Sequence, residues 1–356
     1  MKKFNFSAGP AILPKEVMAE AAESVVDFGG LGFSILEISH RSKEFVAVME
    51  EAQSLAKELL NIPGGYEVLF LQGGASTQFA MAAMNFLGDD EKAGYVDTGS
   101  WSTKAIKEAK RFGETITLSS SKDRNFNYIP KGYDIADDLK YVHITSNNTI
   151  FGTEYHSLPD TNVPFIADMS SNIFSKPVDV SRYGMIYAGA QKNMGPAGTT
   201  LTILSNELMA KQSREVPTML DYNTHIGKSS MFNTPPVFAI YVSMLTMRWV
   251  KAKGGVAAMQ KINQDKAALL YSTLDNSNIF YSPVDAEDRS NMNVTFLIKD
   301  KDLEQSFIDT AAEAGCMSIK GHRSVGGFRA SIYNAMPREG VETLCDVIKT
   351  FESKHG

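Results

Sequence analysis

The region between residues 66 and 205 constrains the fold of this chain most strongly. Short apolar runs alternate there with stretches of helical periodicity. Such strand–helix alternation is typical of a mostly parallel sheet covered by helices on both faces. The apolar runs are residues 68–71, 95–96, 116–118, 141–145, 165–167, 185–188 and 200–204. The sequence therefore predicts an α/β fold whose large domain contains a mostly parallel, seven-stranded sheet.

The segments on either side of this region predict a second unit. Two helices are expected first, at residues 16–28 and 44–60, on the spacing of their apolar side chains. After Trp249 the pattern resets, with helices expected at 255–274, 303–314 and 341–351 and strands at 293–298 and 328–332. We expect a large domain spanning 14–254 and a smaller α+β domain formed by 1–13 and 255–356.

Composition excludes several classes of protein. The chain has 356 residues, of which 43% are hydrophobic, enough for a large core. Its 41 acidic residues outnumber its 35 dispersed basic ones, which argues against a nucleic-acid-binding surface. No apolar run approaches the ~18 residues of a membrane span, and the first residues lack the apolar core of a secretory signal. We therefore expect a cytoplasmic protein.

The cysteines predict neither a disulfide framework nor a metal site. Cys316 and Cys345 are the only two, and neither stands in a CxxC pair or beside a histidine at zinc-binding spacing. We expect both thiols to be buried or unreactive and no metal to be bound.

Polar segments follow four of the predicted strands. They are residues 73–78, 147–149, Asp168, and the pair Gln191 and Lys192. Ligands bind at the carboxyl ends of the strands in open α/β sheets. The sequence therefore predicts that these segments converge on one crevice.

Each of these segments also has a purely structural interpretation. Residues 73–78 form a strand–turn–helix junction that suits a phosphate, but equally a tight turn with a helix cap. Asp168 could cap a helix, which is the commoner role, or pair with a protonated heterocycle nitrogen. Most lysines are solvated, but Lys192 lies among small residues in a stretch with no other charge from 183 to 206. That setting favours a lowered pKa and Schiff-base chemistry.

The segment around Lys192 carries a family resemblance. Residues 183–198, YGMIYAGAQKNMGPAG, resemble the cofactor-lysine segment of phosphoserine aminotransferases, in the fold-type I, class V group of pyridoxal-phosphate enzymes. Residues 4–10, 37–41, 231–236, 320–323 and 329–337 also match the pattern of that family. The resemblance extends over essentially the whole chain.

The resemblance implies pyridoxal 5'-phosphate as cofactor and assigns roles at its ring. Lys192 would form the internal aldimine and later move a proton, and Asp168 would keep the ring nitrogen protonated. The other implied cofactor contacts are Trp101 stacking on the ring, Thr149 at its phenolic oxygen, and Ala75, Ser76 and Gln191 at the phosphate. Asn233 and Thr234 would reach the same phosphate from the second subunit of a homodimer. Many relatives carry arginine in place of Ser76, which puts cofactor affinity in doubt.

The resemblance also implies the substrates. Arg329 would bind the α-carboxylate, while His322 and Arg323, with His40 and Arg41 of the second subunit, would bind the substrate phosphate or the γ-carboxylate of glutamate. The implied reaction is ping-pong, reversible amino transfer between L-glutamate and 3-phosphohydroxypyruvate, giving 2-oxoglutarate and O-phospho-L-serine in serine biosynthesis. Many bacterial members also accept 4-phosphohydroxythreonine, on the route to pyridoxal phosphate.

Two rival hypotheses remain at this stage. One is another class V activity: a cysteine desulfurase would need a reactive cysteine on a mobile loop, and an alanine–glyoxylate type aminotransferase, with its small substrates, would not need both His-Arg pairs. A non-enzymatic binder of the same fold would have lost Lys192 or Asp168, and both are present.

Overall fold

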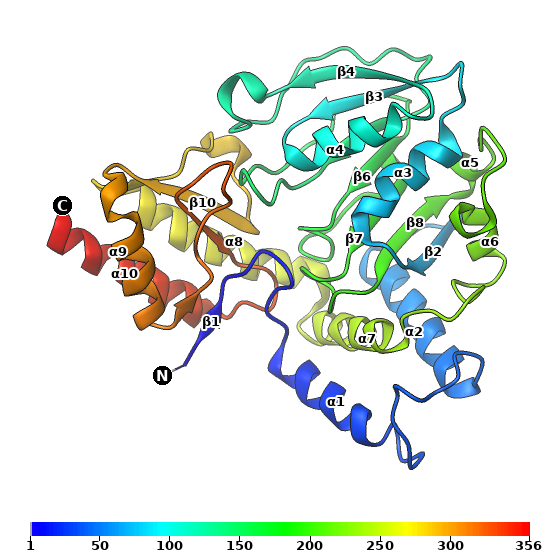
Figure 1. The fold of residues 1–356 in the computed structure, drawn as a ribbon, viewed down its shortest axis with the longest axis horizontal. Helices are drawn as coiled ribbons and strands as arrows, with labels where there is room; N and C mark the ends of the chain where they lie inside the picture. The colour runs from blue at the N-terminus through cyan, green and yellow to red at the C-terminus, as the bar shows by residue number, and fades with distance from the viewer. Residues whose placement is uncertain (1) are drawn as a thin grey trace.

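The structure, a computed structural model, describes residues 2–356 and contains the predicted seven-stranded sheet. The strand order is β2-β8-β7-β6-β5-β3-β4 (Figure 1). β8 runs antiparallel to both of its neighbours, and the other neighbouring pairs are parallel. The strands are β2 (Tyr66–Leu71), β3 (Lys92–Asp97), β4 (Glu114–Ser120), β5 (Val142–Thr145), β6 (Phe165–Asp168), β7 (Tyr183–Gly189) and β8 (Thr200–Ser205). The α/β prediction is confirmed.

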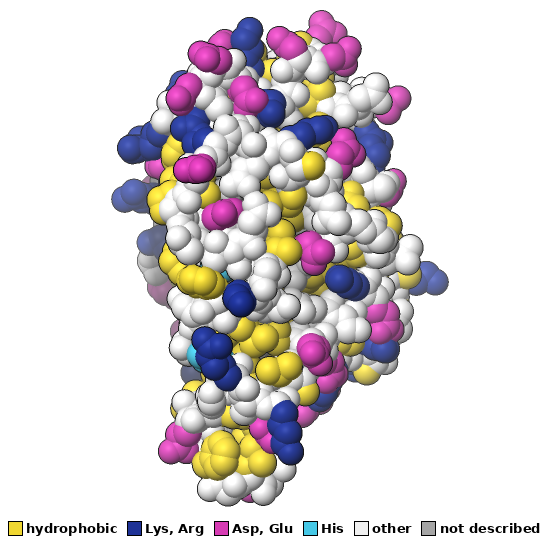
Figure 2. Space-filling model, turned by 90° about the vertical axis from the view of Figure 1, so that its right-hand side faces the viewer, with side chains coloured by type: hydrophobic (Ala, Val, Ile, Leu, Met, Phe, Trp, Pro, Cys, Tyr) yellow, Lys and Arg dark blue, Asp and Glu magenta, His cyan; other side chains and the backbone are white. Residues whose placement is uncertain are grey.

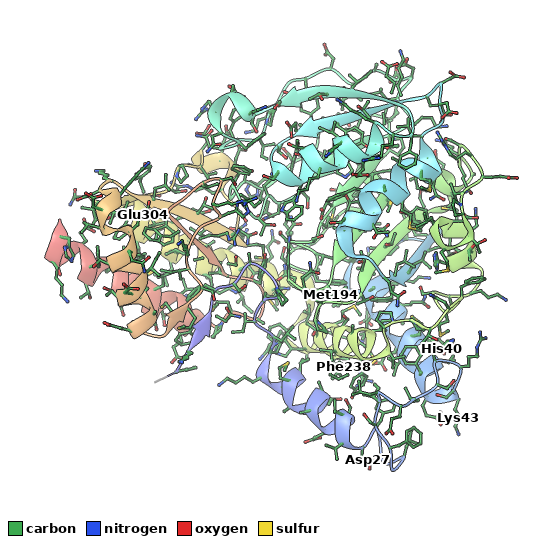
Figure 3. All side chains as sticks on the ribbon, in the orientation of Figure 1. Asp27, His40, Lys43, Met194, Phe238 and Glu304 are labelled. Carbon is green, nitrogen blue, oxygen red and sulfur yellow. The ribbon has the colours of Figure 1, made fainter. Side chains whose placement is uncertain are left out.

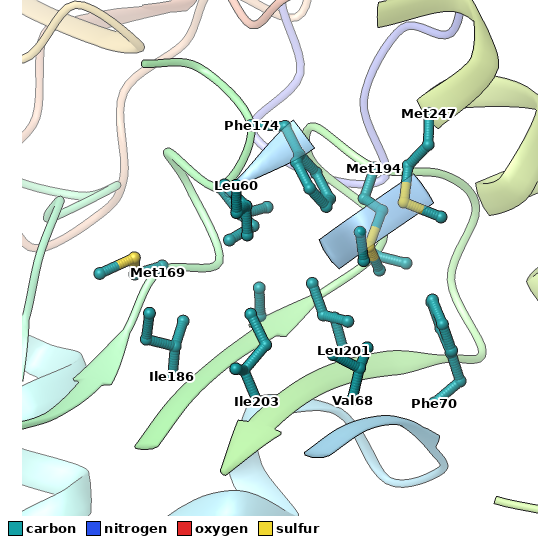
Figure 4. Close-up of a cluster of buried hydrophobic side chains, with 14 of the residues drawn as sticks. Leu60, Val68, Phe70, Met169, Phe174, Ile186, Met194, Leu201, Ile203 and Met247 are labelled. Carbon is teal, nitrogen blue, oxygen red and sulfur yellow. The ribbon is translucent and has the colours of Figure 1, made fainter. Parts of the chain in front are cut away.

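Helices cover both faces of this sheet because successive strand residues point to opposite sides. In β2, Val68 and Phe70 join a cluster with α1 (Lys15–Val26), α2 (Lys43–Leu59) and α7 (Val237–Ala252). Leu69 and Leu71 join a second cluster with α3 (Gly74–Phe86) and α4 (Ser100–Ala109), and the short α5 (Asn206–Met209) and α6 (Tyr222–Ile226) pack there too. Figure 4 shows Val68, Leu201 and Ile203 of the first face beneath Phe174 and Met194.

The first helices differ from their predicted bounds by one or two residues at each end. α1 ends at Val26 rather than at Phe28, and α2 begins at Lys43, after Ser42, whose hydroxyl accepts the backbone N–H of Phe45. α3 begins at Gly74, inside the predicted 73–78 junction, and the small residues of its first turn carry no apolar signal. Within residues 2–356, no helix is long and apolar enough to cross a membrane.

The remaining elements form a second, smaller unit of helices and strands, at the left in Figure 1. β12 (Phe328–Ser331), β10 (Asn293–Ile298) and β9 (Phe280–Tyr281) make an antiparallel sheet, packed with α8 (Gly255–Asp275), α9 (Glu304–Glu313) and α10 (Arg338–His355). β1 (Phe4–Asn5) pairs in parallel with β11 (Cys316–Met317), so the start of the chain joins this unit. Short 3-10 turns lie at Lys122–Arg124, Val180–Arg182, Thr218–Leu220, Ala286–Asp288 and Lys301–Leu303.

Candidate active site

The ends of β2 and β7 lie level with each other at one edge of the large sheet. Leu71, at the end of β2, and Gly189, at the end of β7, both pair with Thr200 of β8, one on each side. The turn before α3 and the segment carrying Lys192 therefore leave the sheet at the same edge. This arrangement agrees with the predicted convergence of the polar segments.

The amine of Lys192 is held between two hydroxyls. Its Nζ donates to Thr149 Oγ1 at 2.8 Å and to Ser171 Oγ at 3.0 Å, and these hydroxyl oxygens are 2.6 Å apart. Burial lowers the pKa of Lys192 to about 8; the negative charge of Asp168 raises it and the positive charge of Arg329 lowers it. A substantial fraction of the amine is therefore neutral near physiological pH, as a nucleophile or base requires.

Asp168 is the last residue of β6 and is only 6% exposed. Its Oδ1 accepts the backbone N–H of Ser170 at 2.9 Å, so the carboxylate caps a turn rather than a helix. Within residues 2–356, Oδ2 accepts no hydrogen bond. One carboxylate oxygen thus stays available for a partner at the carboxyl edge of the sheet.

Arg329 reaches the same place from the smaller sheet. It lies on β12, and its Nη1 donates to the carbonyl oxygen of Thr149 at 3.4 Å. Its Nε is buried and has no hydrogen-bond partner among the described residues. Burial lowers the pKa of the Arg329 guanidinium, although an arginine in a protein stays protonated. The unused donors make Arg329 an anchor for an anion.

The turn between β2 and α3 is a strand–turn–helix junction, as predicted. Gly73 has φ +94°, and a Cβ there would lie 2.1 Å from Thr77 Oγ1, so only glycine fits. The backbone N–H groups of Gly74, Ala75 and Ser76 open α3. Unpaired N–H groups and the helix dipole suit a phosphate, and the exposed Ser76 adds a hydroxyl but no charge.

Trp101 is the second residue of α4 and is partly buried against the second hydrophobic cluster. Its indole Nε1 is buried and has no hydrogen-bond partner among the described residues, an arrangement that a purely structural tryptophan usually avoids. Lys104 Nζ lies 4.3 Å from the centroid of the Trp101 ring. Sequence reasoning missed Lys104, since a lysine one turn along a polar helix face carries no distinctive signal.

A group of basic side chains stands beside Arg329. His322 lies in the loop between β11 and β12, with Nδ1 2.6 Å from Ser324 Oγ. Burial lowers the pKa of His322, and the positive charges of Arg329, Arg323 and Lys104 lower it further. This concentration of positive charge suits a substrate with two anionic groups.

Of the four residues expected from a second subunit, His40 and Arg41 lie away from Lys192 in the same chain, whereas Asn233 and Thr234 lie beside the turn before α3. His40 and Arg41 lie between α1 and α2, and Figure 3 shows His40 well apart from Met194, two residues after Lys192. Asn233 lines a small cavity with Gln72 and Thr77, and Thr234 accepts a hydrogen bond at its carbonyl oxygen from Gln72 Nε2 at 3.5 Å.

Sequence reasoning assigned no role to several neighbours of Lys192. Ser171 accepts from Lys192, and Asn193 Nδ2 donates to the carbonyl oxygen of Ser171 at 2.6 Å. The N-terminal segment also lies here: Ala11 N–H donates to the carbonyl of Gln191 at 2.9 Å, and a Cβ on Gly9 would lie 3.4 Å from Lys192 Cγ. The resemblance of residues 4–10 to the family pattern was the one sequence feature that could have indicated a role for this N-terminal segment.

Both cysteines are buried, as expected. Burial raises the pKa of Cys316 to about 11 and also raises the pKa of Cys345. Thiols in this state are poor nucleophiles, which argues against the desulfurase hypothesis.

Comparison with known proteins places the chain in a family. The aminotransferase class-V family model matches residues 3–344. The phosphoserine aminotransferase of Flavobacterium johnsoniae is 58% identical over 99% of this chain and 100% of its own length, and that of Phocaeicola vulgatus is 56% identical over the full length of both. The solved phosphoserine aminotransferase of Bacillus circulans subsp. alkalophilus superposes with a TM-score of 0.97 at 45% identity, covering 100% of this chain and 99% of that one. The pyridoxal-phosphate-bound phosphoserine aminotransferase of Trichomonas vaginalis gives a TM-score of 0.93 at 35% identity, with 98% and 100% covered. The chain therefore belongs to the aminotransferase class-V family and, within it, to the phosphoserine aminotransferases.

Proposed function

We propose that this protein catalyses reversible amino transfer between L-glutamate and 3-phosphohydroxypyruvate, giving 2-oxoglutarate and O-phospho-L-serine in serine biosynthesis. The single observation that carries the proposal is the buried Lys192 amine, between two hydroxyls and within electrostatic reach of Asp168 and Arg329. Full-length relatives that carry the name phosphoserine aminotransferase support the substrate. Use of 4-phosphohydroxythreonine and a cytoplasmic location stay predictions from the sequence.

The residues present fit pyridoxal phosphate as the cofactor. The free oxygen of Asp168, the unpartnered Trp101 indole and the open N-terminus of α3 are the acceptor, ring surface and phosphate cradle that this molecule needs. When bound, it supplies an electron sink that stabilises negative charge at the substrate Cα. Lys192, Asp168, Trp101, Thr149, Ala75, Ser76 and Gln191 would hold it.

Lys192 would act as the base that transfers the proton during the reaction. The neutral amine that its lowered pKa provides can accept the proton of the substrate Cα at Nζ and, with the cofactor bound, would deliver it to the cofactor carbon C4′. Thr149 and Ser171 orient the amine, since both hydroxyls are within hydrogen-bonding distance of Nζ.

The basic side chains would select the substrate. Arg329 can grip the α-carboxylate with a planar pair of N–H donors, because its Nε has no partner in the described protein. His322 and Arg323 would then receive the phosphate of phosphoserine or the γ-carboxylate of glutamate. The positive charges of Arg323, Arg329 and Lys104 around His322 explain why one site would take two different anionic ends, a phosphate and a carboxylate.

A homodimer would complete each site with His40, Arg41, Asn233 and Thr234 of the second subunit. The segments that carry these residues expose large apolar side chains, which mark an interaction surface. Leu31 is 38%, Phe33 41%, Leu36 62% and Phe232 40% exposed. Figure 2 looks onto the side of the molecule where α6 and the α1–α2 segment lie and shows hydrophobic side chains exposed among charged ones.

We also propose the predicted domain division, with a large domain of residues 14–254 and a small one of 1–13 and 255–356. Support comes from a separate hydrophobic cluster that joins Phe4 and Phe6 to residues from Ala267 to Phe351. The pairing of β1 with β11 supports it as well.

The visible absorption spectrum of the purified protein, before and after addition of O-phospho-L-serine, tests the function. We expect the band of the lysine-linked cofactor to disappear and the band of the pyridoxamine form to appear, and 2-oxoglutarate to reverse the change. A coloured protein whose absorption band does not change with phosphoserine would indicate a different class V substrate. A protein that cannot be reconstituted with pyridoxal phosphate would contradict the enzyme proposal, and Lys192→Ala supplies the spectral blank.

A further inference from the structure

A second buried lysine lies on α8, outside the residues assigned above. Lys266 is 0% exposed, and its Nζ donates to three carbonyl oxygens, of Ile332 at 3.0 Å, Tyr333 at 2.8 Å and Met336 at 3.1 Å. Within residues 2–356 no carboxylate pairs with it. All three N–H donors of the ammonium group therefore bind carbonyl oxygens of one backbone turn, residues 332–336.

Burying an ammonium group without a counter-ion is unfavourable, and an apolar side chain would normally be preferred there. Burial lowers the pKa of Lys266 to about 7, the direction expected for an ammonium group removed from water. The feature that offsets the cost is the tight hydrogen bonding of the 332–336 turn.

Hydrogen bonds of Asn193 connect one side of the turn to the surroundings of Lys192. The backbone N–H of Asn334 donates to Asn193 Oδ1 at 3.0 Å, and Asn193 Nδ2 donates to the carbonyl oxygen of Ser171 at 2.6 Å. Ser171 Oγ in turn accepts from Lys192 Nζ. Hydrogen bonds, linked by the peptide group between Tyr333 and Asn334 and by the covalent structure of Ser171, thus connect Lys266 to the reactive amine.

A second connection runs through the N-terminal segment. The hydroxyl of Tyr333 donates to the carbonyl oxygen of Ala8 at 2.8 Å. Ala8 precedes Gly9, whose backbone lies so close to Lys192 that an added Cβ would be 3.4 Å from Lys192 Cγ. The turn therefore also holds this segment against the Lys192 side chain.

The turn is packed on one side and borders open space on the other: Ile332, Tyr333 and Met336 are buried, and Asn334 Nδ2 donates to the carbonyl oxygen of Phe174 at 3.0 Å. A cavity of about 430 Å³ borders it, lined by Asn334, Ala335 and Met336 on one side and by Trp249 and Met259 on the other. Lys266 is one of several groups that fix the turn, and it contacts three of the carbonyl oxygens of the turn at once.

We propose that Lys266 is a positioning residue for amino transfer: by fixing the 332–336 turn it sets the position of Lys192 relative to Arg329, which lies on the strand that leads into that turn. The inference rests on the proposed function. Loss of Lys266 would displace the Lys192 amine by a small distance, and the rate of amino transfer is sensitive to such displacements.

Lys266→Met, which keeps the length of the side chain but removes the charge and the donors, tests this role in the holoenzyme. We expect the maximal rate of the half-reaction with O-phospho-L-serine to fall about tenfold or more. The O-phospho-L-serine concentration at half-maximal rate should change less. We also expect the midpoint of the pH titration of the visible band, without substrate, to move by at least half a pH unit. A purely structural residue would not move that midpoint.

Ile348→Ala is the control, because Ile348 is buried on α10 in the hydrophobic cluster to which Ala267 and Leu270, the neighbours of Lys266 on α8, also belong. It should lower the melting temperature and leave the titration midpoint of the band unchanged. If Lys266→Met changes only the melting temperature, as this control does, the positioning role is wrong.

Two milder variants keep the test decisive if Lys266→Met does not fold. Tyr333→Phe removes the contact with Ala8, and Asn193→Ala removes the contact with Ser171. Each should shift the titration midpoint in the same direction, and wild-type midpoints and rates in both would overturn the proposal. If the wild-type spectrum itself ignores phosphoserine, the proposed function fails, whereas a responsive wild type with unaffected variants refutes only the role of Lys266.

Discussion

Thr149 and Lys192 are joined by a 2.8 Å hydrogen bond between the hydroxyl oxygen and the amine, while the carbonyl oxygen of the same Thr149 accepts from Arg329 at 3.4 Å. One residue thus contacts both the amine expected to carry out the proton transfer and the guanidinium expected to bind the substrate. Because the acceptors of Lys192 are neutral hydroxyls, they do not hold its proton as a paired carboxylate would. Burial can then lower the pKa of Lys192 to about 8.

The first prediction concerns pH. With a pKa of about 8, roughly a tenth of Lys192 is neutral at pH 7, against well under a thousandth of a lysine at its usual pKa of about 10.4. The rate at which the apoenzyme incorporates pyridoxal phosphate should therefore rise about fivefold from pH 7 to 8 and level off above pH 9. Stopped-flow absorbance would measure this rate. A rise that continues tenfold per unit to pH 10 would show an ordinary lysine.

Removal of the amine gives the second prediction. Lys192→Ala should lower the rate of amino transfer by at least about a thousandfold, since it removes both the covalent attachment point and the base. The far-ultraviolet circular dichroism should be unchanged. Lys299→Ala, at an exposed lysine, is the control and should keep the full rate. A substantial surviving rate in the Lys192 variant would remove this residue from its role.

The third prediction separates the two anionic ends of the substrate. Arg329→Ala should lower kcat/KM by roughly 10- to 100-fold for every amino-acid substrate, the loss expected for a hydrogen bond to a charged group. Arg323→Ala should affect O-phospho-L-serine most and L-alanine, which lacks a second anion, least. Steady-state kinetics with L-glutamate, O-phospho-L-serine and L-alanine would measure the pattern. Equal losses on all three in both variants would contradict the assignment.

Shared sites lead to the fourth prediction. If Arg41 acts in the site of the other subunit, inactive Lys192→Ala and inactive Arg41→Ala subunits should restore activity when mixed, because one site of each hybrid contains both native residues. Random exchange should yield about a quarter of the wild-type activity per site, the statistical share for two independent subunits. Native mass spectrometry would establish exchange, and no recovery after proven exchange would argue against the shared site.

The fifth prediction concerns the thiols. Because burial raises the pKa of Cys316 to about 11, this thiol should resist a disulfide reagent at pH 8 in the native protein and react after unfolding. Cys345 is also buried and should behave in the same way. Absorbance of the released thiolate would count both. Rapid native modification accompanied by loss of activity would revive the cysteine-based alternative.

The connection between β7 and β8 shows what the order of elements could and could not reveal. Both strands were predicted, but their antiparallel pairing was not. Residues 190–199 connect them, and a parallel crossover needs a dozen or more residues, so the length of this connection already favours the antiparallel arrangement. That short connection carries Lys192 and holds it at the edge of the sheet.

By itself the sequence determined the seven strands, most of the helices and the candidate reactive lysine, because apolar periodicity and the absence of nearby charge are local properties of the chain. Only the tertiary structure decided which groups meet Lys192. Arg329 and Thr149 are 180 positions apart, and Asn334 and Asn193 are 141 apart. Such contacts depend on how the hydrophobic cluster of the smaller unit packs against the large sheet and its helices, and local periodicity carries no information about that packing.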